Sequence, residues 1–152
     1  FKGGLASSGE METKYHTATH LLNAALKVVV DKNIHQMGSN ITSERMRFDF
    51  NCDHKLTDEE KLEVENLVNK WIKEDLEVKK ETMNKEDAVK TGAECMFIET
   101  YPDVVTVYTI GDVSKELCGG PHVERTSSLG KFKIVKEQSS SAGVRRIKAV
   151  LE

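Results

Sequence analysis

Apolar side chains recur at helical spacing in two stretches of the N-terminal half of the chain. From about residue 12 to residue 31 they follow one face of an amphipathic helix. The second stretch begins with a capping-box signature, in which Thr57 is followed three residues later by Glu60. The two stripes consist of Leu21, Leu22, Ala25, Leu26 and Val29, and of Val64, Leu67, Val68, Trp71 and Ile72. A third, short helix is expected to start near Asn84 and Asp87 and to end at Gly92.

The other patterned segments are typical of strands. Residues 46–50 alternate apolar and polar side chains, as a half-buried strand does, and residues 76–82 alternate more weakly. Further strands are expected at 94–98, 104–110, 131–137 and 144–151, each bounded by Gly, Pro, Asp or Ser. This order of elements predicts an α+β fold in which helices pack on a largely antiparallel sheet.

The composition excludes several classes of protein. The chain has 152 residues, 38% hydrophobic and 31% charged, which is typical of one globular domain. Its net charge of −3 excludes a globally basic protein, so any contact with nucleic acid must come from a local basic patch. No apolar stretch approaches the roughly 20 residues that span a membrane. The chain starts at Phe1 without a secretion signal, so we expect a piece of a longer cytoplasmic protein.

The three cysteines are too few and too widely spaced for a disulfide scaffold, which again favours a reducing compartment. Cys52 and Cys95 are expected to be small buried hydrophobic residues. Cys118 differs because a glycine pair and His122 follow it, in the sequence CGGPH.

Four residues form a candidate metal-binding set. His16 and His20 lie one helical turn apart on one face, and Cys118 and His122 can converge on them if the paired glycines turn the backbone tightly. A thiolate with three imidazoles suits zinc better than magnesium or calcium. Each pair alone also fits ordinary solvated or buried side chains. The residues leave open whether such a zinc is structural or catalytic.

Four separated motifs resemble the editing domain of bacterial alanyl-tRNA synthetases. They read HTATH, QMGSNITSERMRFDF, SKELCGGPHV and SSSAGVRRIKAVL, and the resemblance covers nearly the whole chain from Met11 to Leu151. The editing domain of threonyl-tRNA synthetases shares the two metal motifs, but the GSN, RFDF and GVRRI phrases favour the alanyl branch. The resemblance implies a domain from residue 12 to residue 152, after a short lead at 1–11. It also implies a cis link to the rest of a parent synthetase.

The resemblance further implies hydrolysis of tRNA for alanine that carries serine, and also glycine, in error. His16, His20, Cys118 and His122 would bind Zn²⁺ or act directly in hydrolysis, with Thr19 and Gln36 lining the pocket. The Thr19 hydroxyl would read the serine side chain, although a threonine here could instead bond to its own helix. Gln36, expected in a polar turn, would hold the serine hydroxyl or the attacking water, unless it is simply a solvated loop residue.

Contacts to the tRNA are expected from basic side chains and from the glycine pair of the CGGPH motif. The best candidates are Arg145 and Arg146, with Arg45 and Arg47 beside the RFDF strand. The other members of the set are Gly119, Gly120, Lys131, Lys133, Lys136 and Lys148. An ordinary solvated sheet face explains each single charge equally well. The acidic helix that starts at Asp58 is expected to face away from RNA.

The sequence departs from the family pattern at two places. Pro121 stands where the family usually has threonine, which removes a hydroxyl and a backbone donor beside His122. Residues 98–101 read IETY, where the family commonly has Gly-Glu-Lys-Tyr.

The alternatives to an editing hydrolase are a structural zinc module that binds the acceptor end without hydrolysis, a metal-free interaction domain and a free-standing editing protein.

Overall fold

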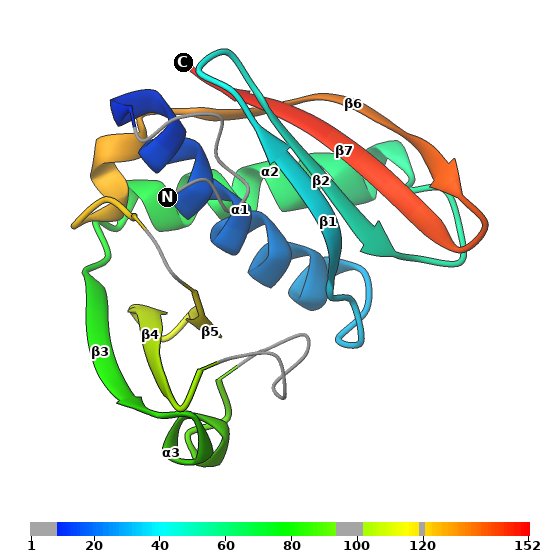
Figure 1. Ribbon diagram of the computed structural model, residues 1–152. Coiled ribbons are helices and arrows are strands. Elements are labelled where there is room, and N and C mark those ends of the chain that lie inside the picture. Colours follow the sequence, from blue (N-terminus) through cyan, green and yellow to red (C-terminus); the bar gives the residue numbers. More distant parts are fainter. Residues whose placement is uncertain (1–8, 94–101, 119–120) are drawn as a thin grey trace.

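A computed structural model describes residues 9–93, 102–118 and 121–152 (Figure 1). Within these residues the chain forms helices and two antiparallel sheets, which confirms the expected α+β class. The helices are α1 (Glu10–Val29), α2 (Asp58–Lys73), α3 (Lys85–Lys90) and the short 3₁₀ helix η2 (Thr126–Leu129). The strands are β1 (Gln36–Ile41), β2 (Met46–Asn51), β3 (Val78–Asn84), β4 (Val104–Ile110), β5 (Ser114–Leu117), β6 (Phe132–Ser141) and β7 (Val144–Leu151).

The larger sheet has the strand order β1-β2-β7-β6, and α1 and α2 lie on one of its faces (Figure 1). Strand β2 alternates, so its residues Met46, Phe48 and Phe50 point into the core, where they are fully buried. The apolar stripe of α1 packs against them, with Leu21, Leu22 and Leu26 fully buried. This core is the main source of hydrophobic stabilisation in the molecule.

The smaller sheet has the order β3-β4-β5 and forms a second part with α3 (Figure 1). Its own small core consists of Ala88, Ala93, Val105, Val107 and Leu117, separate from the main cluster. The helices therefore pack on two antiparallel sheets, whereas the sequence predicted one.

Thr126 of η2 fastens the two parts together. Its hydroxyl donates to the Trp71 carbonyl at 2.8 Å and accepts from the Leu76 amide at 2.8 Å, and its own amide donates to the Leu76 carbonyl. Because the Thr126 side chain is fully buried, these bonds satisfy backbone groups that water cannot reach. They fix the point at which the chain passes from α2 into the small sheet.

Most predicted elements are confirmed within a few residues. The capping box of Thr57 and Glu60 is present, and strands 104–110 and 144–151 coincide with β4 and β7. Asn84 does precede α3, although its side chain makes no capping bond. The expected strand at 94–98 and Cys95 lie outside the described residues. Cys52 is half-buried at the rim of the core instead of fully buried.

Two strands were missed, and one prediction is wrong. Gln36 begins β1 and does not lie in a polar turn, while β5 is only four residues long. The β1 sequence QMGSNI is largely polar and contains a register shift between Gln36 and Gly38, so it shows no clean alternation.

None of the helices in the described part of the chain is both long and apolar enough to cross a membrane.

Asn69 of α2 provides a test of how the helix is fixed to the sheet. Its amide accepts from the Phe132 N–H and donates to the Phe132 carbonyl, both at 2.8 Å, at the start of β6. Asn69→Ala should lower the free energy of unfolding by about 2 kcal/mol, because two backbone groups lose their partner. Asn66→Ala, at an exposed position of the same helix, is the matched control. Equal denaturant midpoints for the two variants would contradict this role.

Candidate metal centre

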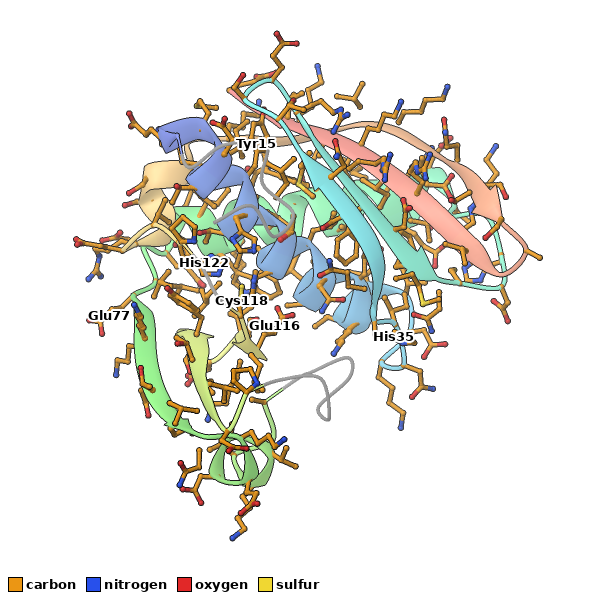
Figure 2. The ribbon with its side chains drawn as sticks, viewed as in Figure 1. Tyr15, His35, Glu77, Glu116, Cys118 and His122 are labelled. Atoms are coloured by element: carbon orange, nitrogen blue, oxygen red, sulfur yellow. The ribbon has the colours of Figure 1, made fainter. Side chains whose placement is uncertain are left out.

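Four side chains from distant parts of the chain converge between α1 and the small sheet. His16 and His20 lie on α1, Cys118 directly follows β5, and His122 precedes η2. Figure 2 shows Cys118, His122 and the neighbouring Glu116 grouped beside α1. One donor atom from each of the four residues lies within 4.8 Å of the others. The structure thus brings together the complete metal-ligand set that the sequence predicts.

The spacing of these atoms fits one small metal ion. The Cys118 Sγ atom lies 3.3 Å from His16 Nε2 and 3.4 Å from His122 Nε2. Sulfur and nitrogen ligands of a tetrahedral zinc are roughly 3.5 Å apart, given zinc bonds of about 2.3 Å to sulfur and 2.0 Å to nitrogen. The rings of His16 and His122 stack with centroids 4.4 Å apart, and His20 meets His122 edge-on at the same distance. The cluster could therefore hold a metal ion.

The outward ring nitrogen of each histidine has its own acceptor. His16 Nδ1 donates to the Pro121 carbonyl at 3.1 Å, His122 Nδ1 lies 3.0 Å from Thr17 Oγ1, and His20 Nδ1 lies 2.7 Å from Glu116 Oε2. The His20 contact is bent, so it is an ion-pair contact without regular hydrogen-bond geometry. A nitrogen that donates outward leaves the Nε2 lone pair free to face inward. This outer support is what metal-ligating histidines normally have.

Thr17 links the His122 ring to the backbone on both sides. Its hydroxyl oxygen accepts from the Val123 amide at 3.1 Å, and the hydroxyl can donate to the Thr13 carbonyl at 3.3 Å. With its one proton used there, the oxygen accepts from His122 Nδ1, which places the lone pair of His122 on Nε2. Sequence reasoning missed Thr17 and Glu116, although both lie inside the metal motifs. The positions of Thr17 and Glu116 in the sequence do not indicate that either residue contacts a histidine ring nitrogen.

The electrostatics of the cluster favour a thiolate. Burial alone raises the pKa of the Cys118 thiol, but its contacts with the rings of His122, His16 and His20 and the positive charge of His20 lower it to about 3. Burial lowers the pKa of His20, yet the Glu116 carboxylate and Cys118 raise it to about 10. Burial and the neighbouring His20 and His16 lower the pKa of His122 to about 4. At neutral pH, the metal-free cluster therefore pairs a thiolate with an imidazolium, and the thiolate is ready to ligate.

Pro121 does not disturb this arrangement. Its missing N–H is not needed, because the contact to His16 uses the Pro121 carbonyl, which proline retains. The hydroxyl lost at this position has a counterpart in Thr17, which supports His122 from the other side. Residues 98–101, the second departure from the family pattern, lie outside the described residues, as do Gly119 and Gly120.

The hydrogen bonds of Thr19 and Gln36 within the described residues do not involve the side chains of the cluster. The Thr19 hydroxyl donates to the His16 carbonyl at 2.7 Å, so its proton is bound to its own helix. Gln36 pairs with Phe50 across β1 and β2, which places it on the helix-covered face, and its amide donates to Ser39 at 3.1 Å. Among the described residues, its hydrogen bonds do not reach the cluster.

The four arginines expected to contact tRNA do not share one surface. Arg146 binds both oxygens of Asp49, at 2.8 and 3.1 Å, on the sheet face away from the helices. Arg47 and Arg45 lie on that same face, and Arg45 donates to Asn40. Arg145 points to the helix side, where it binds Glu137 at 2.6 Å. Since neighbours on a strand face opposite ways, Arg145 and Arg146 cannot act together.

An open groove of about 690 Å³ adjoins the cluster. It runs between the C-terminal half of α1 and the turn that joins β4 to β5, and Asn23, Lys27 and Glu116 are among the residues that line it. Because Glu116 also contacts His20, one side chain separates this groove from the metal ligands. A ligand in the groove would lie directly beside the cluster.

The chain is similar to parts of known aminoacyl-tRNA synthetases. Residues 105–148, which include Cys118 and His122, match the family described as the threonyl and alanyl tRNA synthetase second additional domain. The whole chain is 62% identical to the alanine–tRNA ligase of Treponema denticola and 56% identical to that of Treponema pallidum. It is 56% identical over 99% of its length to the Borrelia hermsii enzyme. The chain spans about a quarter of the length of these relatives.

The fold, the His/Cys cluster and these matches define a second additional domain of the aminoacyl-tRNA synthetases. Within this family, the chain belongs to the alanyl-tRNA synthetase branch.

The Thr17 hydroxyl should be needed for tight metal binding. Thr17→Val keeps the shape of the side chain but leaves His122 Nδ1 without its acceptor, so zinc affinity should fall about 10- to 100-fold. Competition with a chromophoric chelator measures this affinity. Thr13→Val is the matched control, because the Thr13 hydroxyl bonds only to the Gly9 carbonyl among the described residues. Wild-type affinity in Thr17→Val would show that this hydroxyl does not orient a ligand.

Proposed function

We propose that this chain hydrolyses the ester bond that joins serine, and also glycine, to the tRNA for alanine. The observation that carries the proposal is the converged His16, His20, Cys118 and His122 cluster in a domain of the alanyl branch. A pocket shaped for alanine cannot strongly reject serine, which adds one hydroxyl, so a second hydrolytic site is needed to remove the error. The chain would act in cis with the rest of a parent synthetase in the cytoplasm.

The donor set of the cluster suits zinc, because it consists of one thiolate and three oriented imidazoles. Bound zinc would supply Lewis-acid polarisation of an ester or hold the free amino group of the substrate. His16, His20, Cys118 and His122 would hold it, while Thr17, Glu116 and the Pro121 carbonyl fix the rings. In a metal-free reaction, the His122 or His16 ring could accept the proton of the attacking water instead.

Thr19 can recognise the serine hydroxyl by accepting a hydrogen bond from it. Because the Thr19 proton is bound to the His16 carbonyl, the lone pairs of its oxygen are the part left for a ligand. A seryl hydroxyl could donate to them, whereas an alanyl methyl would leave them unpaired. This difference discriminates serine from alanine but not glycine, which has no group to donate. We assign Gln36, on the same side of the sheet, to the attacking water.

A second candidate function is a structural zinc module that binds the acceptor end without hydrolysis. It is favoured by the number of protein ligands, since four saturate a tetrahedral zinc while catalytic zinc usually keeps one position open. The groove beside Glu116 supports either function, because it offers space for the acceptor end next to the cluster.

Release of serine from mischarged tRNA for alanine is the first test. The wild-type chain should release serine and spare alanyl-tRNA, and Cys118→Ala should lower the rate by more than about 100-fold, since outer-shell partners alone cost 10- to 100-fold. Cys52→Ala, a cysteine outside the cluster, should keep wild-type activity. No release from wild-type protein that holds equimolar zinc would establish the structural module instead.

The role of Thr19 can be tested separately through selectivity. Thr19→Val removes the acceptor at constant shape, so the preference for seryl over alanyl ester should fall about 5- to 100-fold, given about 1 to 3 kcal/mol for an unpaired buried polar group. The ratio of the two deacylation rates measures it. Thr17→Val serves as the control, because it should change metal affinity and leave this ratio intact. An unchanged ratio in Thr19→Val would remove this residue from substrate recognition.

A further inference from the structure

One face of the large sheet concentrates positive charge in an acidic protein. We define the outer face as the side of the β1-β2-β7-β6 sheet away from α1 and α2 (Figure 1). Its only outward-facing strand carboxylate is Asp49, in a chain whose net charge is −3. The basic residues of the outer face are Arg45, Arg47, Lys133, Lys136, Arg146 and Lys148.

The strand register places like charges directly opposite one another. Arg47 of β2 pairs with Lys148 of β7, and Lys148 pairs with Lys136 of β6. Neighbouring strands are about 4.8 Å apart, so these three cations form one row about 10 Å long. Like charges in directly opposed positions destabilise a sheet. The row therefore costs stability unless an anion binds to it.

The acidic groups of the protein neutralise this row only in part. Asp49 binds Arg146 in a bidentate pair and forms a longer ion pair with Arg47 Nε at 4.0 Å. Among the described residues, Arg45, Lys133, Lys136 and Lys148 have no carboxylate partner. Arg145, on the opposite face, differs because Glu137 pairs with it at 2.6 Å. The acidic helix α2 also lies on that opposite side.

The arrangement fits an extended polyanion better than a small one. The charges are spread over several neighbouring strands, so they match phosphates that repeat along a nucleic-acid backbone. The sheet and α1, itself about 10 Å across, lie between the outer face and the metal cluster. Nucleotides on this face are therefore not those attached to the amino acid.

We propose that the outer face binds the phosphate backbone of the double-helical part of the tRNA, at a distance from the metal cluster. The inference rests on the proposed function only in taking tRNA as the polyanion. Backbone contacts of this kind add affinity and register without reading sequence. Substitutions on the outer face should thus raise KM for aminoacyl-tRNA and leave kcat unchanged.

The test compares two triple variants with the same change in charge. The first is Arg47→Gln, Lys136→Gln and Lys148→Gln on the outer face, and the second is Lys61→Gln, Lys70→Gln and Lys73→Gln on α2. The probes are an unacylated acceptor-stem hairpin of the tRNA for alanine and its single-stranded 3′ end. For the hairpin, the slope of log affinity against log salt should fall by about 2 to 3 in the outer-face triple, given about 0.7 to 0.9 per phosphate contact. The α2 triple and the single strand should show no such change.

Hydrolysis of a seryl ester of adenosine, which carries no phosphate, separates this inference from the proposed function. Both triples should cleave it at the wild-type rate. Failure of the wild-type chain to cleave any ester, with the hairpin result as expected, would overturn hydrolysis and keep the RNA surface. Hairpin affinity at the wild-type level in both triples would overturn the RNA surface, and the outer face would then be assigned to a protein partner. The same loss of affinity in both triples would attribute the effect to net charge and would also overturn the RNA surface.

Discussion

The contact of the Cys118 thiolate with the imidazoles of α1 joins the two parts of this molecule. His16 and His20 belong to the body built on the large sheet, whereas Cys118 follows the last strand of the small sheet, which has a separate core. The two parts also share apolar contacts, since Ile110 of β4 is buried in the main core, and their docking brings the four ligand atoms within 4.8 Å. A metal that binds only the docked form would stabilise that form by mass action. Chemistry and architecture therefore depend on the same junction.

The outer supports of the histidines hold each ring in a defined orientation. Pro121, Thr17 and Glu116 come from three different segments, and each contacts the outward nitrogen of a different ring. Rotation of any one ring would break its contact. Thr126, through its bonds to Trp71 and Leu76, holds the junction of α2 and the small sheet. The orientation of the ligand rings thus depends on protein contacts outside the cluster.

Sequence reasoning succeeded where a local pattern has one structural meaning. The spacing of His16 and His20 requires a shared helix face, and the glycine pair between Cys118 and His122 indicated that these two could converge on them. It failed where tertiary contacts decide. Thr17 and Glu116 stand within the quoted motifs, yet their contacts to His122 and His20 cross between segments over 90 residues apart.

The missed elements have the same physical origin. Strand β1 is polar and interrupted by a register shift at Gly38, so pairing with β2 stabilises it more than its own pattern does. Arg145 and Arg146 are neighbours on one strand and so face opposite ways, but the sequence does not indicate which of them faces the helices. That choice depends on the packing of Ile147 and Ala149 into the core, which no single strand reveals.

The distribution of charge separates affinity from chemistry. The cations of the outer face lie on one side of the large sheet, while the thiolate and imidazoles lie beyond α1 on the other side. In the proposed complex, the cations of the sheet bind the backbone phosphates of the tRNA duplex. The single-stranded end of the tRNA must pass around the edge of the domain to reach the cluster. Binding energy from the duplex then contributes equally to ground state and transition state, so it lowers KM without accelerating hydrolysis. In this proposal, discrimination between the seryl and alanyl esters comes from groups near the cluster, where the two substrates differ by the one hydroxyl that Thr19 is proposed to read.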